Sequence, residues 1–240
     1  MFKYIRNDSE LDKGSAFDAD PLRREYLART TNSPELLSVY VYDPDTRVRI
    51  AVAQNPNTPN NLLEELTQDS DIWVLDTIAG RDNLSEDLIL KLVSRIEEFE
   101  SLCMKYDDND AWEELGEFVS DIASNSNTPP YILHNISRLY EVCDIIDVSL
   151  AANPNTPEEV LRDILTEYSD SIVEALAENP STPEDVLMEI ATDPTYSYSD
   201  ARYLMAKSKT TPTSVLQVLA KDSDKEVAEL VRKNHNFKES

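Results

Sequence analysis

The chain has 240 residues, of which 40% are hydrophobic, and a formal net charge of −25. This hydrophobic content is enough for a continuous core and excludes wholesale disorder, whereas the excess of carboxylates excludes direct binding to nucleic acid, which requires clustered Lys and Arg. No stretch approaches the roughly 20 apolar residues of a membrane span, and the N-terminus lacks the apolar run of a signal peptide. We therefore expect a cytoplasmic protein.

A short phrase recurs along the chain. Its clearest copies are Asn55-Pro56-Asn57-Thr58-Pro59, Asn153-Pro154-Asn155-Thr156-Pro157 and Asn179-Pro180-Ser181-Thr182-Pro183, and its weaker copies are Asn125-Ser126-Asn127-Thr128-Pro129 and Lys209-Thr210-Thr211-Pro212. We call the last proline of each copy the anchor; anchors stand at 34, 59, 129, 157, 183 and 212, and Ser85 takes the corresponding position at 85. A period of about 26 residues predicts a solenoid in which each repeat contacts its neighbours, folded as one domain.

The sequence of each repeat unit predicts a pair of short helices. Thr58, Thr156 and Thr182 fit helix N-caps, with the following proline at the first helical position. The Asn-Pro pair ahead of each cap ends the previous helix, because the residue before proline avoids the α region. No run alternates Val, Ile and Thr over the length of a strand. The sequence therefore predicts an all-α solenoid.

One repeat carries a resemblance to a known family. The run Val48-Arg49-Ile50-Ala51-Val52-Ala53-Gln54, followed by the phrase at 55–59, by Leu62, Leu63 and Leu66 and by Asp69-Ser70-Asp71, resembles the leucine-rich repeat variant (LRV) family. The resemblance implies an LRV-like, HEAT-like right-handed superhelix of alternating short α and 3₁₀ helices over residues 25–240, after an N-terminal cap of residues 1–24. The first 102 residues contain no cysteine. We therefore carry over no iron–sulfur cluster and expect no cofactor.

The interval between positions 85 and 129 is longer than one period and predicts an acidic helical insertion at about 95–117. Leu88, Leu92, Ile96, Phe99, Leu102 and Tyr106 recur at helical spacing, so the helix after Ser85 should be extended, with its acids on the outer face. Residues 61–200 hold 6 Lys and Arg against 33 Asp and Glu, a net charge of −27, whereas residues 1–60 and 201–240 carry −1 and +3. Such a concentration of one charge favours a positively charged partner, and solubility alone is the simpler alternative.

The candidate partner-binding residues are the acids of the insertion, with one aromatic anchor. They are Glu97, Glu98, Glu100, Asp107, Asp108, Asp110, Trp112, Glu113, Glu114 and Glu117. Tyr196 and Tyr198 flank a loop and are further possible anchors, whereas we expect Trp73 in the core.

The sequence contains no recognisable motif for catalysis or metal binding. Asp107-Asp108-Asn109-Asp110 lacks the glycine and glutamate of an EF-hand, and His134 and His235 are too far apart in sequence for a zinc motif. Three glycines provide no phosphate-binding loop. Cys103 and Cys143 are expected to be buried reduced thiols. We expect no metal site and no enzymatic activity.

The resulting hypothesis is a non-enzymatic repeat protein that binds a basic partner protein through its solenoid surface and acidic band. One alternative is a nucleic-acid mimic that inhibits a DNA- or RNA-binding defence protein or nuclease, of the anti-restriction, anti-CRISPR or immunity type. Another, by family analogy, is an assembly scaffold for a metalloenzyme system, which would bind through a salt-tolerant apolar contact.

Overall fold

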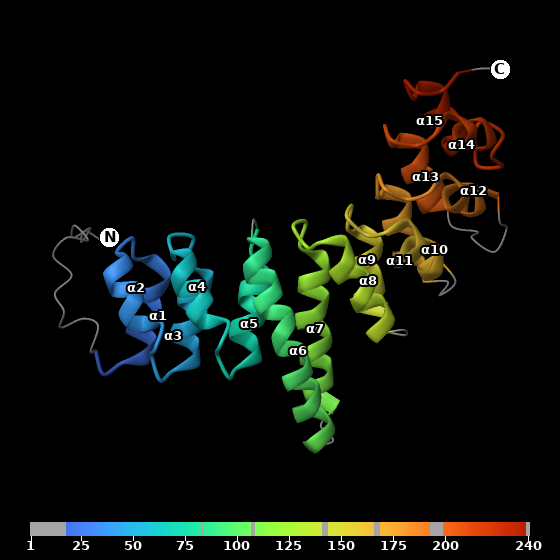
Figure 1. Ribbon diagram of the computed structural model, residues 1–240. Coiled ribbons are helices and arrows are strands. Elements are labelled where there is room, and N and C mark those ends of the chain that lie inside the picture. The colour runs from blue at the N-terminus through green and yellow to red at the C-terminus, as the bar shows by residue number, and fades with distance from the viewer. Residues whose placement is uncertain are drawn as a thin grey trace, which may run out of the picture. The chain divides into compact units, whose positions relative to one another are not determined.

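The repeat phrases separate helices throughout the computed structural model, which describes residues 18–82, 84–106, 109–140, 144–165, 169–192 and 199–238. These residues form 15 α-helices, and no strand occurs among them (Figure 1). The chain divides into two compact units, residues 1–125 and residues 126–240. No helix in the described part of the chain is long and apolar enough to cross a membrane.

Unit 1 consists of two layers of helices. Its elements are α1 (Pro21–Thr30), α2 (Pro34–Tyr40), α3 (Thr46–Gln54), α4 (Asn60–Leu66), α5 (Ile72–Ala79), α6 (Glu86–Tyr106) and α7 (Asn109–Ser124). In one layer, which we call the odd layer, α1 packs on α3, α3 on α5 and α5 on α7. The even-numbered helices pack against the other side of this layer, with α4 also contacting α6.

Unit 2 repeats the same arrangement. Its elements are α8 (Pro130–Leu139), α9 (Asp144–Ala152), α10 (Glu158–Ile164), α11 (Asp170–Glu178), α12 (Glu184–Thr192), α13 (Ser199–Lys207), α14 (Thr213–Leu219) and α15 (Lys225–Lys233). Here α9, α11, α13 and α15 pack in sequence as the odd layer, and α12 packs on α14 behind them. The predicted all-α repeat solenoid is therefore confirmed, although one member of each pair is a short α-helix where the resemblance implied a 3₁₀ helix.

The core lies between the two layers, because each helix buries one apolar stripe. In α4 the stripe is Leu62, Leu63 and Leu66, which are at most 7% exposed. Spacings of three and four residues place such side chains on one face of a helix, and burying one leucine contributes about 2 kcal/mol. Each helix pair thus depends on its neighbours to cover the stripe.

The threonine of the phrase does not cap a helix, contrary to the prediction. The helix begins one residue after the anchor, with Pro59 or Pro157 at the N-cap position and no side-chain cap hydrogen bond. Thr58 Oγ1 instead donates to the Val52 carbonyl at 2.6 Å, and Thr156 makes the same bond to Leu150. The reason is local: in a helix the Val52 carbonyl would accept from residue 56, but Pro56 has no N–H.

In several repeats an asparagine side chain joins the repeat to the one before it. Asn55 Nδ2 donates to the Ala28 and Thr31 carbonyls at 2.7 and 2.8 Å. Asn125, Asn179 and Asn234 make the equivalent pair of bonds, to residues 79 and 81, 151 and 153, and 206 and 208. The Asn55 Oδ1 accepts from the Asn57 N–H at 2.9 Å, so the same side chain also shapes its own turn. We call these bonds the asparagine ladder.

The degenerate repeat keeps the ladder with a different residue. Arg81 stands at the position of Asn55, Asn125 and Asn179 in their repeats, and its Nη1 donates to the Ala53 carbonyl and, at 3.1 Å, to the Asn55 carbonyl. Burial lowers the pKa of this guanidinium. The Arg81-Asp82-Asn83 sequence therefore replaces the asparagine of the phrase without losing the contact between repeats.

A second ladder consists of arginine and aspartate pairs. Arg24, Arg49 and Arg202, each ten residues before an anchor, pair with Asp43, Asp69 and Asp222 at 2.7, 2.6 and 2.8 Å. All six side chains are at most 14% exposed. Each aspartate also accepts from the N–H two residues on, which fixes the turn before the next helix.

The predicted extension of the helix after Ser85 is confirmed, since α6 has 21 residues. The helix α7 is also long, with 16 residues, so the extra chain forms a pair of long helices that reach beyond the other helices of unit 1 (Figure 1). Leu88, Leu92, Ile96 and Phe99 are buried as expected, but Leu102 is 40% and Tyr106 67% exposed, because Cys103 takes the buried position beyond Phe99.

Replacing Asn55 with alanine should leave two buried carbonyls of the preceding repeat without a donor. We expect Asn55→Ala to lower the free energy of unfolding by about 2 to 3 kcal/mol, measured by urea denaturation. Asn57→Ala is the matched control, because the exposed Asn57 side chain bonds to Asn32 at 2.7 Å; it should change stability by less than about 0.5 kcal/mol. Equal effects of the two substitutions would contradict the ladder.

Candidate partner-binding site

The acids of the insertion are distributed over several faces of α6 and α7. Glu97 and Glu98 are exposed and Glu100 is half-buried on α6, whereas on α7 Asp110 and Glu113 are exposed and Glu114 and Glu117 half-buried. Arg95 pairs with Glu98 at 2.9 Å. Asp107 and Asp108 lie outside the described residues. The eight predicted residues that the structure describes therefore lie on both α6 and α7 and differ in exposure.

A tighter carboxylate cluster lies in the odd layer, where α5 packs on α7. It consists of Asp76 from α5 and of Glu117 and Asp121 from α7; we call it the acid seam. Burial, followed by the charges of Asp121 and Glu117, raises the pKa of Asp76 to about 6. Burial and the charge of Glu117 also raise the pKa of Asp121. The charged forms of these groups are therefore disfavoured by their own surroundings.

The acid seam has unused hydrogen-bonding capacity. Asp76 Oδ1 is buried and has no hydrogen-bond partner among the described residues. Within the same described ranges, no Lys or Arg side chain forms an ion pair with Asp76, Glu117 or Asp121. Arg81 follows α5 directly, but its guanidinium is held by the carbonyls at the end of α3.

Gly80 permits the close packing at the end of the seam. A β-carbon at this position would lie 2.7 Å from Asp121 Oδ2, so a larger residue would displace the carboxylate. The Asp121 side chain therefore lies against the C-terminal end of α5.

A hollow of about 420 Å³ lies beside the seam in unit 1. Its apolar lining comes from the start of α5, the end of α6 and the start of α7, and consists of Ile72, Trp73, Phe99, Leu102, Cys103 and Ala111. Asp71 and Glu114 contribute carboxylates to the same lining, and its one guanidinium, that of Arg49 on α3, is paired with Asp69. We call this feature the Trp73 hollow.

Trp73 is not a core residue, contrary to the prediction. It is 42% exposed at the second position of α5, where Asp71 caps the helix by accepting from the Trp73 N–H at 3.1 Å. The apolar stripe of α5 consists of its neighbours Val74, Leu75 and Ile78, which are fully buried. Trp112, predicted as an anchor, is 37% exposed beside Ala111 of the hollow, whereas Tyr196 and Tyr198 lie outside the described residues.

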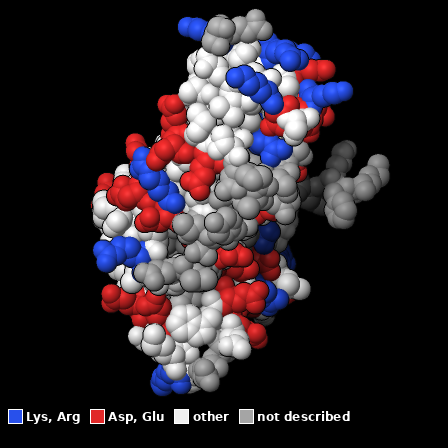
Figure 2. Space-filling model, turned by 90° about the vertical axis from the view of Figure 1, so that its right-hand side faces the viewer, with Lys and Arg blue, Asp and Glu red and all other residues white. Residues whose placement is uncertain are grey.

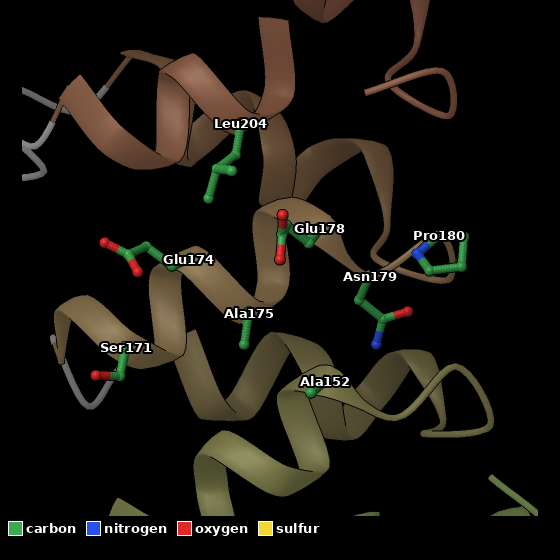
Figure 3. Close-up of a pocket in the computed structure, with 8 residues that line it drawn as sticks. All are labelled: Ala152, Ser171, Glu174, Ala175, Glu178, Asn179, Pro180 and Leu204. Atoms are coloured by element: carbon green, nitrogen blue, oxygen red, sulfur yellow. The ribbon is translucent and has the colours of Figure 1, made fainter. Parts of the chain in front are cut away.

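Unit 2 carries a comparable hollow of about 480 Å³ in its own odd layer. Figure 3 shows Leu204 of α13 on one side, Ala152 of α9 on the other, and the carboxylates of Glu174 and Glu178 of α11 between them. Neither glutamate has an ion pair with a described residue. This hollow has two carboxylates over a floor of small apolar groups, but it lacks an exposed aromatic ring.

The surface charge of unit 2 changes along its helices. Figure 2 shows Lys and Arg frequent over the last helices of this unit and Asp and Glu frequent over its preceding helices. This agrees with the net charge of +3 in residues 201–240.

No group of three His, Cys, Asp or Glu side chains in the described ranges has an arrangement that fits a metal ion. Cys103 is buried, as expected, and forms no disulfide with another described residue, whereas Cys143 lies outside the described residues.

Asp76 and Asp121 were missed from the sequence, although the repeat numbering contains the signal. Asp76 is nine residues before position 85 and Asp121 eight before Pro129, and both residues are half-buried in the odd layer. The residues nine and eight positions before the anchor are Ile50 and Ala51 in the repeat with Pro59, and Glu174 and Ala175 in the repeat with Pro183. The signal for the acid seam is therefore the repeat position of these two acids, which places both on odd-layer helices, and not the local charge density.

Residues 46–71 match the family model described as leucine rich repeat variant. No curated protein matches the chain. The crystal structure of an engineered protein aligns with 94% of this chain and 77% of its own, at 15% identity and a TM-score of 0.43. The all-α repeat fold rests on the chain's own helices and on the LRV match.

The raised pKa of Asp76 predicts a pH dependence of stability. In the unfolded chain the carboxyl has its ordinary pKa, so the folded state binds a proton more tightly, and stability is gained as pH falls through about 6. We expect Asp76→Asn to raise the free energy of unfolding at pH 7 by about 1 kcal/mol, after allowing for partial exposure. The gain should disappear near pH 4. Thermal unfolding at both pH values measures it, with Glu97→Gln as the control of equal charge; a less stable Asp76→Asn protein at pH 7 would contradict it.

Proposed function

We propose that this protein is a non-enzymatic repeat protein that binds a basic partner protein through the odd layer of its acidic segment. The observation that carries the proposal is the acid seam, in which three neighbouring carboxylates have no cationic partner among the described residues. A partner's Lys or Arg side chains would supply the missing charge.

The solubility alternative explains the exposed acids but not the seam. Exposed carboxylates such as Glu97 and Glu113 keep a protein soluble at little cost. Asp76 is different, because a half-buried carboxylate with a raised pKa lowers the stability of the folded protein at neutral pH. Such a cost is typical of residues that are retained for function.

The proposed site differs from the site predicted from the sequence. Glu117 belongs to both sites, whereas the proposed site contains Asp76 and Asp121 in place of the exposed acids of α6. Because each repeat contributes its odd-numbered helix to one layer, a partner in contact with the seam also meets the neighbouring repeats of unit 1.

The test compares two variants that lose the same number of charges. Asp76→Asn, Glu117→Gln and Asp121→Asn together neutralise the seam, and Asp87→Asn, Glu97→Gln and Glu113→Gln together neutralise exposed positions of α6 and α7. We expect the seam variant to lose partner capture from lysate at about 0.1 M salt and the surface variant to retain most of it, with bound proteins identified by mass spectrometry.

The same experiment separates the rival functions. Release of the partner by duplex DNA and by about 0.5 M salt would favour nucleic-acid mimicry. In that case DNA competes with this protein for the partner, and salt screens the charges that hold the partner to this protein or to DNA. A partner that is retained equally by both variants and at high salt would contradict the proposal and favour an apolar contact of the scaffold type.

A further inference from the structure

We propose that the Trp73 hollow receives a large apolar side chain of the partner, next to Lys or Arg residues that contact the acid seam. This inference rests on the proposed function and adds to it the class of peptide that the site selects: a basic segment that carries an apolar anchor.

The hollow offers an apolar surface that the described residues of unit 1 leave partly exposed. Trp73 and Leu102 are 42% and 40% exposed at its edge, and Phe99 and Cys103 form buried parts of its lining. Trp112, the neighbour of Ala111 in sequence, is 37% exposed. Aromatic side chains in such positions contribute much of the binding energy of protein interfaces, because they bury a large area at low entropic cost.

The acids lie at a fixed spacing from this apolar surface. Glu114 lines the hollow, and Glu117 and Asp121 follow on the next two turns of α7. Trp73 and Asp76 are likewise one turn apart on α5. With a rise of about 1.5 Å per residue, the carboxylates extend about 10 Å from the hollow, which corresponds to three or four residues of an extended peptide.

Charge complementarity selects the occupant. A second copy of this chain carries the same net charge of −25 and is repelled overall. An uncharged apolar ligand would fill the hollow but leave the acid seam without cations. A segment with one large apolar residue followed by several basic residues satisfies both parts of the site.

The experiment uses labelled synthetic peptides of twelve residues and fluorescence anisotropy at about 0.1 M salt. One peptide has a phenylalanine followed by four arginines at alternating positions, and the matched peptide has glycine in place of the phenylalanine. We expect the phenylalanine peptide to bind the full-length protein at least about 10-fold more tightly than the glycine peptide.

Substitutions in the hollow test whether it causes the preference for the phenylalanine peptide. Trp73→Ala and, separately, Leu102→Ser should reduce the ratio of the two affinities to below about 3, with the helical circular-dichroism spectrum unchanged. Tyr26→Ala is the matched control, because Tyr26 is 65% exposed on α1 of the same unit; it should leave the ratio unchanged.

The outcomes distinguish the two proposals. Equal binding of both peptides, abolished by the triple substitution of the acid seam, would overturn the apolar anchor and leave the binding of basic partners intact. A preference for phenylalanine that survives both Trp73→Ala and Leu102→Ser would also overturn the anchor site. Absence of binding by either peptide would overturn both proposals.

Discussion

The side-chain amide that joins one repeat to the next is the interaction on which the fold depends. In repeats with an Asn-Pro pair, the odd-layer helix ends directly before the asparagine. The carbonyl groups of its last turn are therefore left without intrahelical donors. The buried amide of Asn55 or Asn179 satisfies two of these carbonyls in the preceding repeat and accepts a bond from its own turn. Since the interior excludes water, the repeats must stack in the register that keeps these bonds.

The position is defined by its bonds and not by one residue type. Arg81 reaches the two equivalent carbonyls of the preceding repeat with a guanidinium, although its repeat lacks both prolines of the phrase. A longer side chain with several donors can therefore replace the amide, at the cost of burying a charged group whose pKa is lowered. The degenerate repeat is a part of the same solenoid layer for this reason.

The sequence predicted those features that depend on periodicity. The spacing of the anchors predicted helix pairs, and the run from Leu88 to Phe99 predicted a longer α6, because apolar residues three and four positions apart share one face of a helix. The prediction that Thr58 caps a helix was wrong. A threonine hydroxyl can accept a hydrogen bond at the start of a helix or donate one at the end of a helix, and the sequence alone does not distinguish the two roles. Trp73 was misplaced because α5 has enough other apolar residues to fill its buried stripe.

The acid seam was missed because charge density along the sequence does not indicate proximity in space. The arginine ladder shows where the charge balance changes: ten residues before the anchor, the outer repeats have Arg24, Arg49 and Arg202, whereas the four repeats between them have Leu75, Val119, Asp147 and Val173. The inner repeats thus lack the arginines that neutralise aspartates in the outer ones. At this repeat position the four inner repeats have no cation, and the guanidiniums of Arg81 and Arg95 are held elsewhere, on backbone carbonyls and on Glu98. No described Lys or Arg pairs with Asp76, and this is the observation from which a basic partner is proposed.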